Sequence, residues 1–353
     1  MTVAQRRKLI DKLDAEIVRL LNERTAHVLE IGEEKARTNQ ELFTPDRIKI
    51  LVDRLARLNK GPLSDESLRA IYREVISGSL AQHKTMTIAY LGPAATYTHQ
   101  AALNRFGASL NYAPQKTIAD VFAEVERASA DYGVVPVENS TEGVVTHTLD
   151  MFVDSDLKIV AQALMPINHC LISRIKKGGI KKLFSHPQAL AQCRGWIQTH
   201  MPDAEIVETT STTRAAERAK TEKASGAIAS SLAAEIYKLK VLDSGIQDSA
   251  GNMTRFLVLG RKSPEPSGKD RTSVMFSIAH KSGALHKALE PFRRRRINMT
   301  KIESRPSKRK AWEYFFFVDI EGHEKDGKVA RALDSLAEHC SLVKVLGSYP
   351  TME

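Results

Sequence analysis

The sequence is poor in cysteine and contains no long hydrophobic run. Its three cysteines, Cys170, Cys193 and Cys340, lie far apart and form no CxxC pair, which argues against a disulfide framework and a thiolate zinc site. The eleven histidines show no metal-ligand spacing, so we expect no metal. No apolar stretch approaches the roughly 18 residues of a membrane span, and no apolar segment follows the basic residues near the start. We therefore expect no membrane segment, no secretory signal and a cytoplasmic location.

Aromatic residues make up only 6% of the chain, and 52 Lys and Arg outnumber 42 Asp and Glu, which gives a net charge of +10. The basic run from Arg293 to Arg296 suggests nucleic-acid binding. However, basic residues are spread along the chain, and no aromatic-rich RNA motif or helix-turn-helix pattern accompanies them. A basic run at the end of a helix also suits the helix dipole. We therefore expect no nucleic-acid partner, and the charge favours an enzyme that binds small anionic substrates.

A length of 353 residues predicts two or three domains. Residues 1–84 have the pattern of three helices. The first, from about 4 to 37, carries apolar residues at helical spacing, the second follows Pro45, and the third begins after the capping residue Ser64. The first helix is too long to pack on itself within a small domain, so the pattern predicts an intertwined dimer.

A different pattern follows the three helices. Residues 85–262 alternate short apolar strands with helical segments, which predicts an α/β domain with a largely parallel sheet and room for two lobes around a cleft. The composition of residues 263–271 is that of a linker. Residues 272–353 have the order βαββαβ, the ferredoxin-like pattern. Because that fold hosts many functions, the order alone does not assign one.

Two basic residues lie on the apolar stripe of the first helix. Arg24 is seven residues from both Ile17 and Ile31, and Lys35 is seven residues after Val28. Lys35 is near the helix end, where its ammonium group either reaches solvent or binds an anion. Arg24 is in the middle of the helix, where a buried guanidinium without a partner is strongly destabilising. Arg24 therefore needs a protein carboxylate or an anionic ligand.

This segment, RRKLIDKLDAEIVRLLNERTAHVLEIGEEK, resembles the first helix of the all-helical chorismate mutases. The resemblance places Arg7, Arg24, Lys35 and Arg47 on the cations with which that family binds its substrate, and it implies that Arg7 comes from a partner chain. The implied reaction is the Claisen rearrangement of chorismate to prephenate, which needs no nucleophile and no proton transfer. Such a site holds the dianion in a folded conformer and places a cationic donor, here Lys35, at the ether oxygen.

Three further positions of this domain, Thr44, Ile48 and His83, differ from the mutase pattern. Thr44 stands where the family has Asp, and Ile48 stands where the family has a Glu that binds the ring hydroxyl of the substrate. His83 aligns with the family's Gln or Glu that faces the ether oxygen, and a one-residue slip would place Gln82 there instead. These departures leave open a second interpretation, in which the domain has lost mutase activity and serves dimerisation or regulation.

Five blocks of the middle domain, in the order GPAATYTHQAA, PVENSTEG, FSHPQALAQC, TTSTTRAAERA and DSAGNMTRF, resemble the prephenate dehydratases. The resemblance implies a two-lobed fold like that of periplasmic binding proteins, and the conversion of prephenate to phenylpyruvate, water and carbon dioxide without a metal or organic cofactor. Thr254 is implied as the donor to the leaving hydroxyl group. The other implied cleft residues are Glu138, Asn139, Ser185, Gln192 and Cys193, with Ser211, Thr212 and Arg255 close by.

Three residues of this domain need comment. Ala95 replaces the usual Gly of the first loop, and we expect its methyl group to be tolerated. Cys193 with His186 would suit a nucleophile pair, but the reaction offers no acyl or phosphoryl group to attack, so we expect a packed thiol. Glu138 is equally well explained as a cap or as a partner of a backbone amide.

The C-terminal domain resembles the ACT domains attached to these dehydratases. Its SGAL and ESRP motifs match the two motifs with which the family binds phenylalanine at a subunit interface. A helix N-terminus after Gly283 suits a carboxylate, and Glu303 suits an amino group. The implied site comprises Gly283, Ala284, Leu285, Asn298, Glu303, Ser304, Arg305 and Pro306. A merely structural, dimer-forming domain is the alternative, and the role of the arginine run stays open.

The resemblance covers essentially the whole chain and implies the family of bifunctional chorismate mutase–prephenate dehydratases of phenylalanine biosynthesis. The expected ligands are chorismate, prephenate and the effector L-phenylalanine, bound by a homodimer or homotetramer. A more distant alternative is an amino-acid sensor without catalytic activity. The intact motif around Thr254 argues against a sensor, which would not need that residue.

Overall fold

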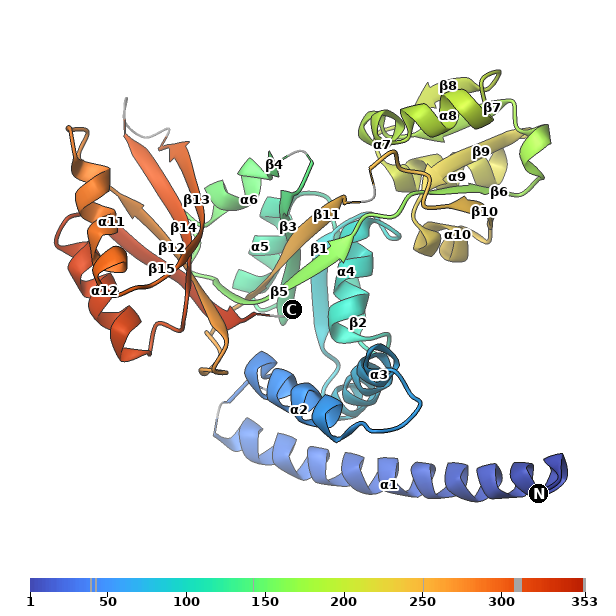
Figure 1. The fold of residues 1–353 in the computed structure, drawn as a ribbon, viewed down its shortest axis with the longest axis horizontal. Coiled ribbons are helices and arrows are strands. Elements are labelled where there is room, and N and C mark those ends of the chain that lie inside the picture. The colour runs from blue at the N-terminus through green and yellow to red at the C-terminus, as the bar shows by residue number, and fades with distance from the viewer. Residues whose placement is uncertain (39, 42, 142, 250, 308–312, 352–353) are drawn as a thin grey trace.

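The computed structural model describes residues 1–38, 40–41, 43–141, 143–249, 251–307 and 313–351. A helical part, a two-lobed α/β part and a C-terminal α+β part follow one another along the chain (Figure 1). The helical part consists of α1 (Val3–Arg37), α2 (Pro45–Leu58) and α3 (Asp65–His83). The side chain of Ser64 caps α3 and a proline begins α2, as the sequence predicts, and the side chain of Thr2 caps α1.

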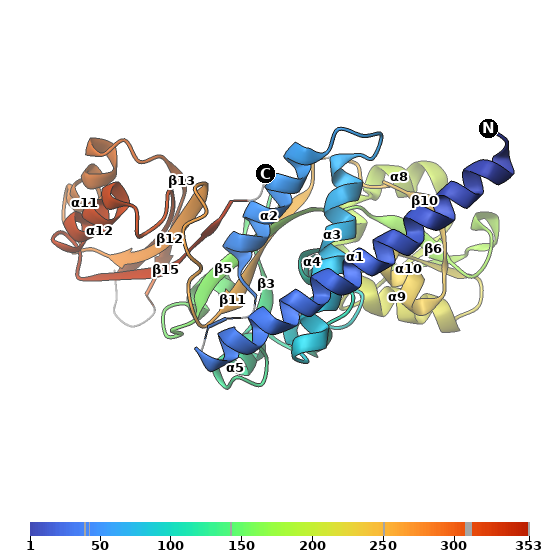
Figure 2. The same ribbon diagram turned by 90° about the horizontal axis from the view of Figure 1, so that it is seen from below.

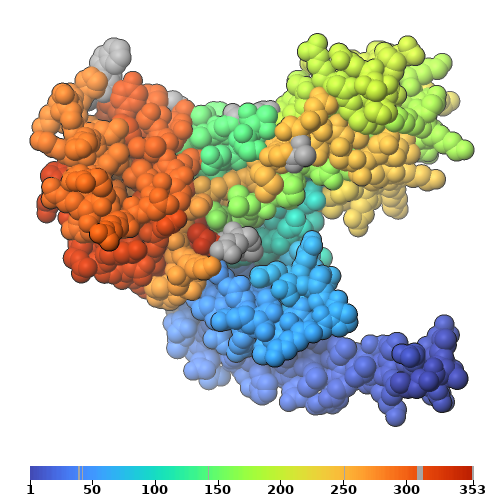
Figure 3. Space-filling model, viewed as in Figure 1, coloured from blue at the N-terminus to red at the C-terminus, as the bar shows by residue number. Residues whose placement is uncertain are grey.

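Figure 3 shows that the N-terminal half of α1 stands clear of the rest of the molecule, and Figure 2 shows the full length of the helix from below. Every residue of the chain up to Glu23 is exposed. The apolar stripe of the helix is therefore open to solvent, and Leu13 and Ile17 are 63% and 52% exposed. An uncovered stripe of this length is typical of an interaction surface.

The α/β part begins with lobe 1, formed by residues 87–166 together with a strand that returns at residues 253–260. Its sheet has the order β2-β1-β3-β11-β5, with the short β4 beside β3. The elements are β1 (Thr87–Leu91), α4 (Tyr97–Phe106), β2 (Asn111–Gln115), α5 (Ile118–Glu126), β3 (Tyr132–Asn139), β4 (Gly143–Val144), α6 (Thr146–Met151), β5 (Lys158–Pro166) and β11 (Met253–Gly260).

Lobe 2 comprises residues 170–244, and its sheet has the order β10-β6-β9-β7-β8. Its elements are β6 (Cys170–Ser173), a 3-10 turn (Lys177–Gly179), β7 (Lys182–Ser185), α7 (Pro187–Gln192), α8 (Arg194–His200), β8 (Glu205–Glu208), α9 (Thr212–Thr221), β9 (Ser225–Ala229), α10 (Ser231–Tyr237) and β10 (Lys240–Ser244). Sequence reasoning placed one helix over residues 189–200, whereas the structure ends α7 at Gln192 and begins α8 at Arg194. The Asp248 carboxylate accepts the backbone N–H groups of Gly195 and Trp196, and so caps the second helix separately.

Both sheets are mixed rather than largely parallel. In lobe 1, β11 runs antiparallel to β3 and β5, and in lobe 2, β6 runs antiparallel to β9 and β10. The reason is that the chain crosses between the lobes twice, once after β5 and once before β11. The second crossing inserts a late strand into the middle of the first sheet, and alternating strand and helix segments in the sequence do not reveal such a return.

The C-terminal part has the βαββαβ order that the sequence predicts. It comprises β12 (Asp270–Ser277), α11 (Ala284–Arg294), β13 (Met299–Pro306), β14 (Tyr314–Glu321), α12 (Gly327–Ala337) and β15 (Leu342–Pro350). The antiparallel sheet has the order β13-β14-β12-β15. The two helices cover one face, where Phe276, Phe292 and Val318 form a core. The other face packs against lobe 1.

Two apolar clusters join the three parts. Phe317, Leu346 and Tyr349 of the C-terminal sheet share one cluster with side chains of lobe 1 such as Val137 and Leu257. A second cluster of lobe 1 includes Phe43 and, at its edge, Ile48 of α2. The helical and C-terminal parts are therefore packed on lobe 1 through buried apolar surface. Lobe 2 is joined to lobe 1 by the two crossings (Figure 1) and by the loop before α4, whose Ala95 packs in the core of lobe 2.

Candidate active sites and effector site

Thr254 lies in β11, directly after the second crossing between the lobes. The strand register places it opposite Asn139 of β3, and only 7% of it is exposed. The Asn139 amide nitrogen donates to two acceptors, Thr254 Oγ1 at 2.8 Å and Asn252 Oδ1 at 2.7 Å. The structure thus brings together two of the residues that the sequence implies for catalysis.

A chain of hydrogen bonds continues from these residues into lobe 2. Asn252 Nδ2 donates to Gln192 Oε1 at 2.9 Å, and Gln192 Oε1 also lies 2.8 Å from His169 Nε2. At the far end, the Tyr97 hydroxyl lies 2.9 Å from His169 Nδ1. Sequence reasoning missed Tyr97, His169 and Asn252. Tyr97 and Asn252 lie within two of the blocks quoted above, GPAATYTHQAA and DSAGNMTRF, which are the signal that could have found them. His169 lies in none of the five blocks, and the first crossing between the lobes places it.

The directions of these hydrogen bonds follow from the number of protons available. Gln192 Oε1 can only accept, so His169 must carry its proton on Nε2. Burial lowers the pKa of His169, which favours the neutral ring, so Nδ1 carries no proton and can only accept. The Tyr97 hydroxyl has one hydrogen and two acceptors within reach, the Asn168 carbonyl at 3.0 Å and His169 Nδ1 at 2.9 Å. At the other end of the chain, Thr254 Oγ1 accepts from Asn139. The hydroxyl hydrogen of Thr254 is then available for an acceptor in the cleft.

A pocket of about 260 Å³ opens beside this chain at the mouth between the lobes. Most of its lining residues have polar side chains. They come from the turn between β3 and β4, from α7 and from the second crossing: Thr141, Ala191, Gln192, Gln247, Asp248, Ser249 and Asn252. Thr254 is linked to the lining residue Asn252 through Asn139, whose amide nitrogen donates to both. Apart from Asp248, whose carboxylate is engaged by the backbone N–H groups of Gly195 and Trp196, the polar groups of the pocket are uncharged donors and acceptors, which suit the hydroxyl and carboxylate groups of a small organic acid.

The structure does not bring every implied residue of this domain to the chain of hydrogen bonds that begins at Thr254. Ser185 is fully buried, and its hydroxyl donates to the Ile228 carbonyl at 2.7 Å. Cys193 is also fully buried, and burial raises the pKa of its thiol to about 12, which suits a packed thiol rather than a nucleophile. Ser211 caps α9 by accepting the Arg214 N–H, and Thr212 is the first residue of that helix. Ala95 has a φ of 68°, the left-handed region that favours glycine, and its methyl group packs in the core of lobe 2.

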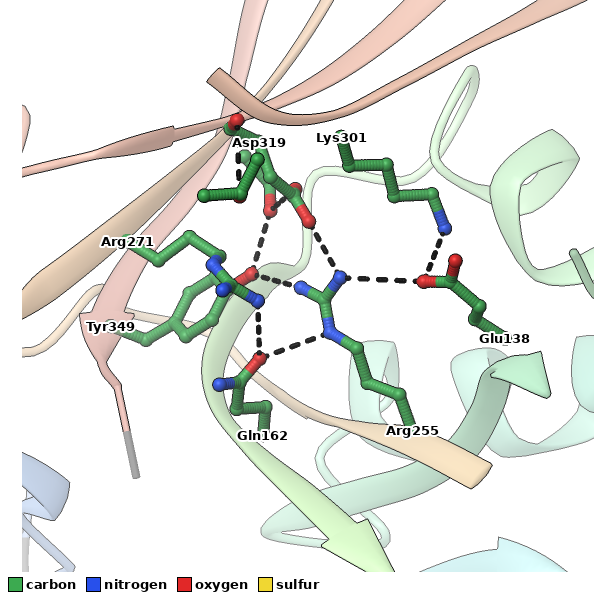
Figure 4. A network of polar contacts seen from close by, with 9 residues as sticks. Glu138, Gln162, Arg255, Arg271, Lys301, Asp319 and Tyr349 are labelled. Carbon is green, nitrogen blue, oxygen red and sulfur yellow. Dashed lines mark hydrogen bonds and ion pairs between the residues drawn. The ribbon is translucent and has the colours of Figure 1, made fainter. Parts of the chain in front are cut away.

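Arg255 of β11 and Glu138 of β3 form the pair next to Thr254 and Asn139 in the strand register. Because side chains alternate along a strand, those of Arg255 and Glu138 lie on the opposite face of the sheet from Thr254 and Asn139. The Arg255 guanidinium donates to Asp319 Oδ2 at 2.6 Å and to the Tyr349 hydroxyl at 2.8 Å, both in the C-terminal sheet (Figure 4). Glu138 accepts from Lys301 Nζ at 2.8 Å. The sequence places both residues at the substrate, whereas the structure places both side chains at the contact with the C-terminal domain.

The cations of the helical domain gather near the C-terminal half of α1. Lys35 is half-buried, and its ammonium group donates to the Glu41 carbonyl at 3.0 Å. Burial, followed by the nearby positive charge of Arg47, lowers the pKa of Lys35. Arg24 Nη1 donates to the buried hydroxyl of Ser79 at 3.2 Å. Ser79, on α3, is a polar member of this group that sequence reasoning missed.

Arg7 lies far from these residues in the same chain. It is exposed, and 28 positions of one straight helix separate it from Lys35, about 42 Å at 1.5 Å per residue. Within one copy the two side chains cannot bind the same small molecule. The arrangement agrees with the implied contribution of Arg7 from a partner chain.

The three positions that differ from the mutase pattern, and the alternative Gln82, have distinct surroundings. Thr44 precedes α2 without a capping hydrogen bond from its side chain, and Ile48 packs against the apolar cluster of lobe 1. The His83 ring lies against Gly32, where any larger residue would collide with it, and its buried Nδ1 finds no hydrogen-bond partner among the described residues. Gln82 is exposed. Of the two alternatives on α3, His83 therefore points toward α1.

Most of the implied effector residues lie toward one end of the C-terminal sheet, whereas Asn298 precedes β13 at the other end, beside Glu321. Ser277, which leads into the SGAL turn, and Arg305 of the ESRP segment both lie opposite Phe315 in the strand register. Gly283 has a φ of 75° and begins α11, followed by Ala284 and Leu285. Asn298 donates to Glu321 at 2.9 Å. Along β13, Glu303 and Arg305 are less exposed than Ser304 and Pro306, and Arg305 pairs with Asp150 of α6 at 3.2 Å.

Within the described residues, no group of three or more His, Cys, Asp or Glu side chains is arranged to hold a metal ion. None of the helices described is long and apolar enough to cross a membrane. The arginine run is partly paired within its own helix, because Arg293 and Arg294 both bind Glu290 at 2.7 and 2.9 Å.

Comparison with known proteins identifies three families along the chain. Chorismate mutase type II matches residues 6–84, prephenate dehydratase matches residues 88–264, and the ACT domain matches residues 272–338. A bifunctional chorismate mutase/prephenate dehydratase of Aquifex aeolicus is 49% identical over 349 residues, which are 98% of this chain and 96% of that protein.

Two solved structures resemble the last three quarters of the chain. One is a prephenate dehydratase of Arthrobacter aurescens in complex with L-Phe, which is 35% identical, has a TM-score of 0.71 and aligns over 75% of this chain and 90% of its own. The other, GqqA, is described as a novel type of quorum-quenching acylase. It is 30% identical, has a TM-score of 0.70 and aligns over 75% of this chain and 98% of its own.

Proposed function

The chain belongs to the prephenate dehydratase family, in the form that also carries a chorismate mutase domain and an ACT domain, and we propose that it performs both reactions of that form. It converts chorismate to prephenate, and prephenate to phenylpyruvate, water and carbon dioxide, with feedback regulation by L-phenylalanine. We assign residues 1–84 to the mutase, 85–262 to the dehydratase, 263–271 to a linker and 272–353 to the regulatory domain. Three free cysteines suit a reducing compartment, the cytoplasm.

The hydrogen-bonded pair of Asn139 and Thr254 carries the dehydratase assignment. In the reaction, the ring carboxylate leaves as carbon dioxide, and its bonding electrons enter the ring while the hydroxide departs from the opposite carbon. Charge therefore grows on the departing oxygen, and a donor placed there stabilises the transition state. Because Thr254 Oγ1 accepts from Asn139, its own hydrogen is directed to that oxygen. Aromatisation provides the driving force, so the chain needs to supply only position and hydrogen bonds.

An Asn139→Asp variant tests this arrangement of protons. A carboxylate has the same shape as the amide but cannot donate, so the Thr254 hydroxyl would turn to donate to it instead of to the substrate. We expect kcat for prephenate to fall about 10²-fold, comparable to the loss of one transition-state donor. Steady-state rates of phenylpyruvate formation measure the effect. Chorismate turnover by the same sample should be unchanged, and an unchanged kcat for prephenate would contradict the assigned direction of the hydrogen bond.

The grouping of Lys35, Arg24 and Arg47 supports the mutase assignment. Chorismate and prephenate carry two carboxylates, and the rearrangement shifts negative charge onto the ether oxygen as the bond to it breaks. Arginines hold carboxylates in fixed geometry, and the Lys35 ammonium serves as the donor at the ether oxygen. Arg7 of a second copy completes the site, since Arg7 of the same chain is too distant.

We propose that the exposed stripe of α1 is covered by α1 of a second copy, in a homodimer or a homotetramer built from such dimers. A double variant, Leu13→Glu with Ile17→Glu, places two charges on that stripe and should yield monomers in sedimentation velocity. Chorismate turnover should be lost with the dimer, because Arg7 would no longer reach its site, while prephenate turnover should persist. Ala15→Glu, on the opposite side of α1, is the matched control and should leave the dimer intact. Dimers of the double variant at wild-type concentration would contradict the proposal.

Separate assays with chorismate and with prephenate distinguish the proposal from its alternatives. Turnover of both substrates supports it. Turnover of prephenate alone would select a dehydratase with an inactive helical domain, and turnover of neither would select an amino-acid sensor. Ser185 and Cys193 do not suit the nucleophile of an acylase, because both are fully buried and the Ser185 hydroxyl is already engaged.

A further inference from the structure

We propose that Arg255 is a positioning residue that couples the C-terminal sheet to Thr254, through a buried polar network shared by the two domains. The inference rests on the proposed function, because it names the contacts through which phenylalanine bound to the C-terminal domain alters the dehydratase site. It also gives Arg255 a role other than the substrate contact that the sequence implies.

The network joins the four strands of the C-terminal sheet to three strands of lobe 1, β3, β5 and β11 (Figure 4). In the strand register, Asp319 of β14 lies opposite both Ser273 of β12 and Lys301 of β13. Asp319 accepts from Ser273 Oγ at 2.5 Å and from Arg255 Nη1 at 2.6 Å. Lys301 reaches Glu138, which also lies 3.8 Å from Arg255. Each charge is thus held by groups of the other domain.

Gln162 of β5 and Tyr349 of β15 complete the set of side chains that contact the Arg255 guanidinium. Its Nε donates to Gln162 Oε1 at 3.0 Å, and its Nη2 donates to Tyr349 Oη at 2.8 Å. Arg255 is 8% exposed, Asp319 is 7% exposed and Tyr349 is fully buried. A buried ion pair that loses one partner is strongly destabilised. If the two domains moved apart at this point, Arg255 would either follow Asp319 or lose its buried partner, so a domain movement displaces the Arg255 side chain.

The network touches both members of the Thr254 pair through the backbone. Arg255 follows Thr254 in β11, and Glu138 precedes Asn139 in β3. A shift of Arg255 or Glu138 toward the C-terminal sheet would change the separation of Asn139 Nδ2 and Thr254 Oγ1, now 2.8 Å. Since that bond sets the direction of the Thr254 hydrogen, a small displacement alters the donor to the leaving hydroxyl.

On the other side, the network touches the proposed effector site through β13. Lys301 is two residues before Glu303, so both side chains lie on the same face of that strand, toward lobe 1. An effector that binds Glu303 to Pro306 displaces or fixes β13, and with it the Lys301 ammonium. Coupling between two sites requires that each ligand favours one arrangement of a shared element, and the geometry makes β13 and this network that element.

Lys301→Met is the mildest test, because it removes one peripheral cation and leaves the Arg255–Asp319 pair intact. Lys344→Met is the matched control. The Lys344 ammonium also crosses from the C-terminal sheet to lobe 1, where it donates to the carbonyls of Phe152 and Ser155 at 3.2 and 2.7 Å, but neither residue adjoins Thr254 or Asn139. A paired variant, Arg255→Met with Asp319→Leu, removes the central charges together and so avoids a buried unpaired charge.

The measurements are phenylalanine binding by calorimetry and the ratio of dehydratase kcat/KM without and with saturating phenylalanine, on the full-length protein. A coupling of about 5–150-fold is expected for the wild type and for Lys344→Met. We expect Lys301→Met and the paired variant to bind phenylalanine within about threefold of the wild-type affinity but to respond by less than about twofold. Chorismate turnover and thermal unfolding verify that each variant is folded.

The possible outcomes separate this inference from the function on which it rests. A responsive wild type together with equally responsive Lys301→Met and paired variants would overturn the inference alone. Lost phenylalanine binding in Lys301→Met would also overturn it, because the residue would then belong to the effector site. A wild type that does not respond to phenylalanine would overturn the proposed regulation, and the coupling role would fail with it.

Discussion

Replacing Thr254 with alanine is expected to lower kcat for prephenate by about 10²–10³-fold, the cost of losing one donor to a developing negative charge. The substitution removes the hydroxyl that accepts from Asn139 and donates to the departing oxygen. It removes little else, because the residue is small and lies at the end of a strand whose other side chains form the core. The rate of phenylpyruvate formation at saturating prephenate measures the effect, and chorismate turnover should stay at the wild-type rate.

Thr254→Ser is the matched control for that experiment. Serine keeps the hydroxyl and loses only a methyl group, so it should retain most of the activity, reduced by the extra rotational freedom of its side chain. Equal losses in the alanine and serine variants would show that the methyl group and its packing, not the hydroxyl, matter at this position. That result would remove Thr254 from its assigned role.

Replacing Lys35 with methionine should have a similar effect on the other reaction. Methionine preserves the length of the side chain but removes the donor at the ether oxygen, so we expect kcat/KM for chorismate to fall about 10²–10³-fold. Prephenate turnover should be unaffected, since Lys35 and Thr254 belong to different domains. Lys49→Met is a suitable control. Lys49 also lies in the helical domain, but its ammonium is paired with Asp53 at 2.6 Å.

The same lysine predicts a dependence on pH. Burial and Arg47 lower the pKa of Lys35, so its ammonium loses its proton at a lower pH than that of an ordinary lysine. Because the reaction needs the protonated form, kcat/KM for chorismate should decline as the pH rises through that lowered pKa. The pH profile of free-enzyme kcat/KM reports this titration. A profile that stays flat into the range of an exposed lysine, or a Lys35→Met variant of wild-type activity, would contradict the assignment.

The sequence predicted the fold where local patterns decide it. Pro45 and Ser64 mark helix starts, the apolar runs mark β1, β3, β5, β9 and β11, and the order βαββαβ identifies the last domain. It did not predict that β11 inserts between β3 and β5, because a strand that returns after a whole lobe leaves no local signal. For the same reason, the helix over residues 189–200 was expected to be continuous, whereas Asp248 of the distant crossing divides it.

The resemblance predicted those site residues that lie within the matched sequence blocks. Thr254, Asn139 and Gln192 belong to matched blocks, and the structure joins them in one chain of hydrogen bonds. The blocks could not show which way each side chain points. Arg255 and Glu138 occur in the same blocks, but the two-residue period of a strand turns them toward the C-terminal sheet. His169 and Asn252 lie in the crossings, where only the assembled fold brings them together.

The most direct test of the whole account supplies chorismate alone and identifies the product. Wild-type protein should form phenylpyruvate, because it performs both steps. The Thr254→Ala variant should consume chorismate at the wild-type rate and accumulate prephenate in equal amount, and the Lys35→Met variant should form neither product at an appreciable rate. Phenylpyruvate formed by Thr254→Ala at the wild-type rate would contradict the central claim that this hydroxyl, held by Asn139, expels the ring hydroxide.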